Sequence, residues 1–158
     1  MGMFGARGSR RAAVAGAVAV VATLGLVGTA QADTAQMDGA TPGTPCSAAA
    51  RACVDLDAHE AWLIDGGSVV RGPVGVSSGG EGHETPRGVF RIEWKHRDHR
   101  SAEFDGAPMP FAAFFAPGGI AFHEGSLTSS SAGCVRLVRE EAEAFFDFLQ
   151  VGDRVEIV

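Results

Sequence analysis

Positive charge is scarce in this sequence. Its 158 residues contain 13 lysine and arginine residues against 19 aspartate and glutamate residues, which gives a formal net charge of −6 at pH 7. Three of the arginines and none of the acids fall within residues 1–32, so the remainder of the chain carries −9. Nucleic-acid binding depends on lysine and arginine that neutralise phosphates. We therefore predict no nucleic-acid partner.

Charge is absent altogether from residues 12–30, which are small or apolar. Basic residues precede this run, the last of them Arg11, and Ala30-Gln31-Ala32 follows it, which is the pattern of a secretory signal peptide. We predict that residues 1–32 are a cleaved signal and that the protein is exported. The alternative is a retained membrane anchor, because the run is near the lower limit of length for a membrane span.

Cysteine is also scarce, with three residues in the chain. Six residues separate Cys46 from Cys53, whereas Cys134 stands alone far downstream. The most economical pairing is a local disulfide between Cys46 and Cys53, which leaves Cys134 free. An unpaired cysteine in an exported protein needs a reason, and catalysis is the best one. Residues 33–52 are poor in large apolar groups and are predicted to be a linker, with the folded domain over residues 53–158.

No internal repeat is visible, and the length is enough for one domain of ordinary size. From Cys53 onward the chain alternates short apolar stretches with glycine-containing turns such as Asp65-Gly66-Gly67, which is typical of short β-strands and hairpins. The stretch Lys95–Phe104 is dense in charge and histidine and is predicted to be a surface loop.

One helix is predicted over Arg139–Gln150. Apolar residues recur there at the spacing i, i+3, i+4, i+7, and acidic residues occupy its first turn. The apolar positions are Ala142, Phe145, Phe146 and Leu149. The predicted fold class is therefore mainly β, with one packed helix in the C-terminal region.

The residues best suited to chemistry lie between Ile120 and Leu137. His123 ends a short apolar run, and Cys134 follows eleven residues later after a loop rich in glycine and serine. A thiol becomes a good nucleophile when a nearby imidazole takes its proton. Both residues fall where strands are predicted to end or begin, and the flexible loop between them can fold back. The spacing indicates a Cys–His catalytic pair.

The order of motifs resembles the YkuD-type L,D-transpeptidase catalytic domain. Thr85-Pro86-Arg87-Gly88-Val89-Phe90 comes first, then the strand that ends in His123, then Ser-Ala-Gly-Cys-Val-Arg-Leu, a helix and a final Gly-Asp-Arg-Val-Glu-Ile strand. The resemblance covers about Cys53 to Val158. It implies a β-sandwich-like fold, a location in the cell envelope (periplasmic or cell-wall space), and a reaction on bacterial peptidoglycan. The implied partners are donor and acceptor stem peptides, with carbapenem β-lactams as covalent inhibitors.

The resemblance assigns roles within the motif. It implies that Cys134 attacks the carbonyl after the third stem residue, with His123 as base, and that another stem then takes the acyl group in a 3→3 cross-link. The backbone N–H groups of Gly133 and Cys134 are the expected oxyanion donors. Ser131 and Arg136 are assigned either to substrate binding or to the loop.

Two departures from the family pattern concern Ala132, before Gly-Cys, and Glu124, after the base. The resemblance implies that a backbone carbonyl near Glu124 orients the imidazole, and the carboxylate of Glu124 is a weaker alternative. Thr85, Pro86 and Gly88 are implied to pack beside the site, although Thr-Pro-x-Gly by itself indicates only a turn.

No cofactor or metal is predicted. His83, His96 and His99 could join His123 or Cys134 in a zinc site, but their spacing fits no closed zinc pattern.

Three alternatives to transpeptidation remain at this point. Water could resolve the same acyl-enzyme, which would make the protein an L,D-carboxypeptidase, or the enzyme could attack an existing cross-link as an endopeptidase. In a different class, the chain could be a non-catalytic cell-wall-binding module, in which Cys134 reacts no faster than an ordinary thiol.

Overall fold

A computed structural model describes residues 39–158. The predicted signal peptide and the first part of the predicted linker, residues 33–38, lie outside the described residues. Within the described range, no helix is both long and apolar enough to cross a membrane.

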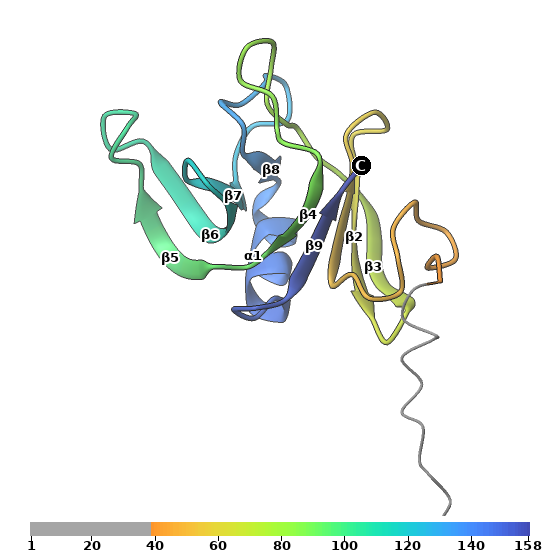
Figure 1. Cartoon of the computed structure of the whole chain (residues 1–158). Coiled ribbons are helices and arrows are strands. Elements are labelled where there is room, and N and C mark those ends of the chain that lie inside the picture. The colour runs from red at the N-terminus through yellow and green to blue at the C-terminus, as the bar shows by residue number, and fades with distance from the viewer. Residues whose placement is uncertain (1–38) are drawn as a thin grey trace, which may run out of the picture. The chain divides into compact units, whose positions relative to one another are not determined.

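Two β-sheets and one helix make up this part of the chain (Figure 1). The five-stranded sheet has the order β3-β2-β1-β9-β4, and the four-stranded sheet has the order β5-β6-β7-β8. The elements are β1 (Ala52–Asp55), β2 (Glu60–Asp65), β3 (Ser68–Gly75), β4 (Gly88–Arg91), β5 (Trp94–Arg100), β6 (Pro108–Ala116), β7 (Ile120–Glu124), β8 (Val135–Leu137), α1 (Arg139–Phe148) and β9 (Arg154–Ile157). The β1–β9 and β7–β8 pairs are parallel, and the other pairs are antiparallel. The predicted mainly β class is confirmed.

The core lies between the sheets and around the helix. Ala142, Phe145 and Leu149 from the predicted apolar stripe of α1 are at most 1% exposed. They pack into one cluster with residues of both sheets, among them Phe115 and Phe122. Burying aromatic and aliphatic side chains of this size contributes about 1.5–3 kcal/mol each. The helix ends at Phe148, two residues before the predicted end, which is within the usual uncertainty of helix boundaries.

The prediction of a surface loop over Lys95–Phe104 is wrong for its first part, because β5 occupies Trp94–Arg100. Its polar composition has a structural cause. Arg97 lies over the ring of Phe146 at 5.0 Å and forms ion pairs with two acids of α1, at 3.2 Å and 2.7 Å. Lys95 donates to the carbonyl of Leu149 at 2.5 Å. Alternate side chains of β5 therefore reach the helix through charged ends rather than through apolar groups. As a result, the sequence of β5 lacks the alternation of apolar and polar residues that predicts a strand.

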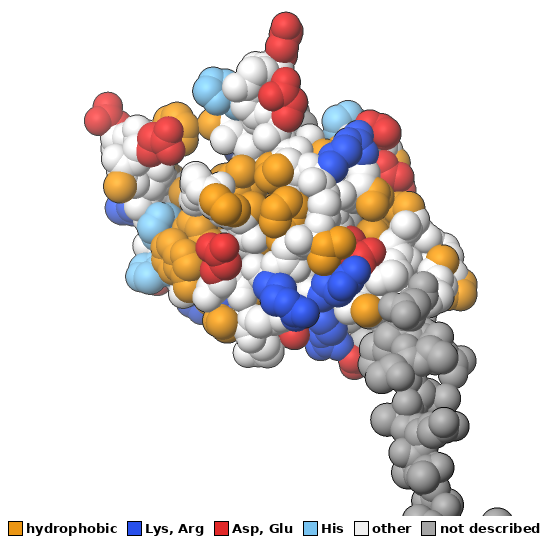
Figure 2. All heavy atoms as spheres, in the orientation of Figure 1, with side chains coloured by type: hydrophobic (Ala, Val, Ile, Leu, Met, Phe, Trp, Pro, Cys, Tyr) orange, Lys and Arg blue, Asp and Glu red, His pale blue; other side chains and the backbone are white. Residues whose placement is uncertain are grey.

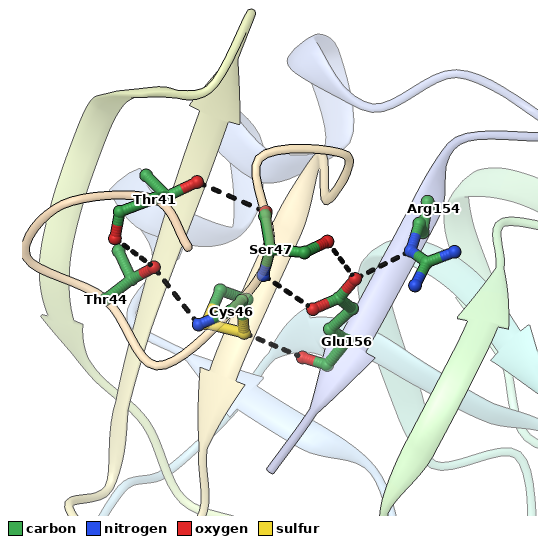
Figure 3. The surroundings of a disulfide bond; sticks show 7 residues. Thr41, Thr44, Cys46, Ser47, Arg154 and Glu156 are labelled. Atoms are coloured by element: carbon green, nitrogen blue, oxygen red, sulfur yellow. Dashed lines mark hydrogen bonds and ion pairs between the residues drawn. A yellow bond between two sulfur atoms is a disulfide. The ribbon is translucent and has the colours of Figure 1, made fainter. Parts of the chain in front are cut away.

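The segment before β1 also differs from the linker expected over 33–52, because its described part is folded onto the sheet. Cys46 forms a disulfide with Cys53, and both are buried. Glu156 of β9 accepts hydrogen bonds from the backbone N–H and the hydroxyl of Ser47, at 2.9 Å and 2.6 Å, and from Arg154 at 2.6 Å (Figure 3). Burial alone would raise the pKa of Glu156, but these hydrogen bonds outweigh it and hold that pKa below 4.5.

Replacing Cys46 and Cys53 together with alanine is expected to lower the free energy of unfolding by about 2–3 kcal/mol, the amount that the chain-entropy model gives for closing so short a loop. Urea denaturation of the variant and the wild type measures this difference. A variant as stable as the wild type would show that the Ser47–Glu156 contacts suffice to hold the segment.

Candidate active site

The site lies on the face of the four-stranded sheet that points away from the core. Side chains alternate along a strand, so β6 sends Phe111 and Phe115 into the core and Ala112 and Phe114 to the other face. That second face carries its own buried apolar cluster, with Cys134 packed against it. A sheet with two apolar faces therefore forms both one side of the core and the floor of the site.

A cavity of about 780 Å³ opens above this floor. Its walls are the β5–β6 hairpin on one side and, on the other, the loops that follow β7 and precede β8 (Figure 1). Figure 2 shows acidic side chains at the ends of the two projections on this side of the molecule, the β5–β6 turn and the loop between β3 and β4. Glu103 of the hairpin and Glu124 at the end of β7 both line the cavity.

Both members of the predicted Cys–His pair line this cavity. In the parallel β7–β8 pair, Phe122 lies opposite Val135 and His123 lies opposite Arg136. Because Phe122 and Val135 face the core, His123 projects to the opposite face, on which Cys134 also lies. The pairing of two strands separated by a loop thus places on one face, and in one cavity, the two residues that the sequence places eleven positions apart.

The carbonyl of Glu124 fixes the orientation of the His123 ring. It lies 2.7 Å from Nδ1, and a carbonyl can only accept, so Nδ1 bears the hydrogen and Nε2 has the free lone pair. This is the backbone contact that the family resemblance implies. Burial lowers the pKa of His123 below 6.5, the Glu124 hydrogen bond acts in the opposite direction, and the charge of Arg136 adds to the lowering. The ring is therefore a neutral base at pH 7.

The sulfur of Cys134 lies 3.6 Å from the carbonyl of Gly119. Burial raises the pKa of the Cys134 thiol above 9.0, while a hydrogen bond from the backbone of Ala121 and the charge of Arg136 lower it by less. The resting pair is consequently thiol and imidazole rather than thiolate and imidazolium. Proton transfer has to accompany attack on a substrate.

Alkylation by iodoacetamide tests this protonation state. We expect the rate for Cys134 to be low at pH 7 and to rise as the pH increases through 9.0 and above, because only the thiolate reacts. The measurement is the rate of mass gain on the full chain at a series of pH values. A rate that stays high down to pH 5 would contradict the neutral pair.

The loop that carries the nucleophile is held by Ser131. Its hydroxyl donates to the carbonyl of Cys134 at 2.6 Å and accepts from the N–H of Gly133 at 3.1 Å. The structure thus differs from the expected oxyanion hole at Gly133, whose N–H is already engaged within the loop. No hydrogen bond of the described residues engages the N–H of Cys134. Gly133 is still required, because its φ of +110° disfavours other residues.

Thr85 anchors the same loop from the other side. It is 3% exposed, its hydroxyl donates to the carbonyl of Gly133 at 2.8 Å, and it accepts from the N–H of Gly79 at 2.9 Å. Thr85 therefore acts through the backbone rather than as part of the cavity wall. Pro86 is half-buried and Gly88 begins β4 on the five-stranded sheet, so both lie outside the cavity lining.

Replacing Thr85 with valine is expected to lower the free energy of unfolding by about 1–3 kcal/mol, because a carbonyl and an N–H lose their partners while the shape is kept. Urea denaturation measures the loss. Thr85→Ser, which retains the hydroxyl, is the matched control and should lose much less. Equal losses in the two variants would show that the methyl group, and not the hydrogen bonds, stabilises the loop.

Arg136 and Glu124, the two charged residues of the motif, both contact other groups of the protein in this structure. The guanidinium of Arg136 lies 3.3 Å from the carbonyl of Ser130 and 3.5 Å from that of Ser129. Arg136 also lines the cavity, so its remaining donors can reach a ligand. The carboxylate of Glu124 forms an ion pair with Arg139, the first residue of α1, at 2.9 Å, and does not orient His123.

The other histidines of the predicted set do not gather around His123 and Cys134, although the rings of His96 and His99 pack edge-on with centroids 5.7 Å apart. His83 is exposed in the loop before β4, His96 is exposed on β5, and His99 lines the cavity. Among residues 39–158, no group of three or more histidine, cysteine, aspartate or glutamate residues is placed to hold a metal ion.

Sequence reasoning missed the aromatic wall of the cavity. Trp94 and Phe114 lie on paired strands, with stacked rings 3.7 Å apart. The only available signal was the tryptophan directly before the polar stretch. The contributions of the Gly119 carbonyl and the Ala121 backbone next to the sulfur were also missed, because backbone groups leave no trace in residue types.

The sequence matches the YkuD family, described as the L,D-transpeptidase catalytic domain, over residues 49–157. The chain therefore belongs to this family, and the predicted family membership is confirmed. No curated protein shows a significant match.

Solved structures with the same fold include several L,D-transpeptidases. The protein from Stackebrandtia nassauensis is 26% identical with a TM-score of 0.64, over 68% of this chain and 54% of that one. The protein from Xylanimonas cellulosilytica is 27% identical with a TM-score of 0.63, over 73% and 63%. The L,D-transpeptidase LdtMt1 in complex with imipenem is 24% identical with a TM-score of 0.60, over 68% and 57%. This chain thus matches only slightly more than half of the first protein's length.

Proposed function

We propose that this protein is a peptidoglycan L,D-transpeptidase that forms 3→3 cross-links through an acyl-thioester on Cys134. The observation that carries the proposal is the convergence of Cys134 and of His123, with its Nε2 lone pair free, on one cavity of a YkuD domain. Similarity to L,D-transpeptidases of known structure supports the same activity.

In the first half-reaction, Nε2 of His123 takes the proton of Cys134 as the sulfur attacks the carbonyl carbon after the third residue of the donor stem. The N–H of Cys134, which no hydrogen bond of the described residues engages, is the proposed oxyanion donor, and such a donor stabilises the transition state by about 3 kcal/mol. The tetrahedral intermediate then expels D-alanine, whose amine receives the proton from His123. A thioester remains on the sulfur.

In the second half-reaction, the side-chain amine of an acceptor stem attacks the thioester. His123 takes a proton from that amine, the carbon–sulfur bond breaks, and His123 passes the proton to the departing thiolate, which restores the neutral pair. Glu103 in the cavity lining favours the approach of a cationic acceptor, whereas the carboxylate of Glu124 is paired with Arg139. No cofactor takes part in either half-reaction.

The proposed site of action is the cell envelope after export. The signal-like pattern of residues 1–32 and the buried Cys46–Cys53 disulfide, which suits an oxidising compartment, support this location. The proposed partners are donor and acceptor stem peptides. Carbapenems are proposed inhibitors, because a related structure holds imipenem.

Incubation of the full chain with a tetrapeptide stem, followed by mass spectrometry, tests the reaction. We expect a cross-linked dimer and free D-alanine. Trimmed tripeptide without dimer would replace transpeptidation with L,D-carboxypeptidase activity. An unchanged stem, together with no covalent carbapenem adduct on Cys134, would favour the non-catalytic wall-binding module.

A further inference from the structure

An aromatic platform stands at the end of the cavity furthest from β8. Trp94 is 43% exposed, whereas Phe114 beneath it is 2% exposed. Their rings are stacked at 3.7 Å with an angle of 6° between the planes. His99 packs edge-on against both, at 5.3 Å from the indole and 5.0 Å from the phenyl ring. The indole is thus supported on one face and open on the other.

Two uncharged polar groups, the hydroxyl of Ser101 and the ring of His99, lie beside this platform. Ser101 accepts hydrogen bonds from the N–H groups of Glu103 and Phe104, at 3.3 Å and 3.1 Å, so its own hydroxyl hydrogen can be donated to a ligand. Burial, and to a lesser degree the charge of His96, lowers the pKa of His99, so that ring is neutral at pH 7. A pyranose ring has the matching chemistry, because one face presents C–H groups and the rim presents hydroxyls.

The sheet register gives the distance from the platform to the nucleophile. Trp94 lies opposite Phe114, and Phe114 lies opposite Ala121. Extending the β7–β8 pairing by one residue places Cys134 beside Ala121. Three strand spacings of about 4.8 Å put the two ends of this row about 14 Å apart.

That distance suits one part of the substrate. Three extended stem residues span roughly 10–11 Å, and the thioester carbonyl is at the third. When the third carbonyl is at the sulfur, the stem end joined to a sugar therefore lies about 3–4 Å short of the far end of this row, a gap of about one residue that the linkage to the sugar and the sugar ring itself span. The leaving D-alanine is one residue from the sulfur and cannot reach the platform.

We infer that the exposed face of Trp94 binds a sugar ring of the glycan strand that bears the donor stem. This inference rests on the proposed function. It predicts that the protein distinguishes a stem attached to its disaccharide from the free peptide.

The test compares kcat/KM for a disaccharide–tetrapeptide and the free tetrapeptide with the full chain. We expect the wild type to prefer the disaccharide form by roughly three- to tenfold, the range that an aromatic stacking contact gives. Trp94→Ala should lose the preference and Trp94→Phe should retain part of it. A general loss of activity cancels in the ratio. Val151→Ala, an exposed apolar residue outside the cavity lining, is the control and should keep the wild-type ratio.

Tryptophan fluorescence gives an independent measure. The sequence has two tryptophans and no tyrosine, and Trp62 is only 5% exposed. A tetramer of N-acetylglucosamine should change the emission of the wild type saturably and leave that of Trp94→Phe unchanged.

The outcomes separate the two proposals. Equal kcat/KM for both substrates in an active wild type, with unchanged emission, would overturn the glycan platform and leave the proposed function intact. Absence of reaction with either substrate would overturn both.

Discussion

Cys134→Ala is expected to form no thioester with a tetrapeptide stem and no covalent adduct with a carbapenem. Cys134 is the only free cysteine among residues 39–158, and loss of a covalent nucleophile lowers kcat/KM by about 10³-fold or more. Intact-protein mass spectrometry of the full chain measures the adduct directly. The wild type should gain the mass of one inhibitor molecule and the variant none.

Two further variants show whether the loss of activity comes from the missing nucleophile or from impaired folding. Cys134→Ser keeps the size and a hydrogen-bonding group but exchanges the thiol for a poorer nucleophile, so it should lose nearly as much activity. Replacing Cys46 and Cys53 together should leave adduct formation intact at temperatures where the variant is folded, since the disulfide lies on the other sheet. Comparable losses in all three proteins would assign the importance of Cys134 to folding.

His123→Gln is expected to slow acylation of Cys134 by about 10²- to 10⁴-fold, the usual contribution of a general base. The glutamine side chain is polar and of similar reach but cannot take a proton from the thiol. The measurement is the rate of carbapenem adduct formation under single-turnover conditions. His83→Gln, on an exposed loop outside the cavity lining, is the matched control and should react at the wild-type rate.

The pH dependence of kcat/KM for the wild type tests the direction in which the pKa of His123 is shifted. Burial lowers the pKa of His123 below 6.5, so the base stays neutral as the pH falls through 6.5. We expect the acidic limb of kcat/KM to lie below pH 6.5, and His123→Gln should lack that limb. An acidic limb above pH 6.5 would contradict the lowered pKa.

Much of the fold could be predicted because its signals are local. The hairpin at Asp65-Gly66-Gly67 and the apolar stripe of α1 depend on neighbours within a few residues, and both are present in the structure. The strand β5 could not be predicted, because its inward-facing side chains are charged. Those side chains are satisfied by α1, which follows about 40 residues later in the chain.

The candidate site also has a part that the sequence predicted and a part that it did not. The presence of Cys134 and His123 in one cavity was expected from their spacing and from the family resemblance. Three contacts could be found only in the structure. Ser131 engages the N–H of Gly133, Thr85 supports the same loop, and Trp94 stacks on Phe114. Each of these contacts joins segments, or backbone groups, whose geometry leaves no pattern in residue types.

By itself, the sequence determined the class of fold, the family, and the two side chains able to supply a nucleophile and a base. Tertiary structure alone decided that the resting pair is neutral, that Ser131 engages the N–H of Gly133, and that an aromatic wall stands on the far side of the cavity. The physical reason is that residue type sets what a group can do, whereas protonation state and access depend on burial and on neighbours that only folding brings into contact.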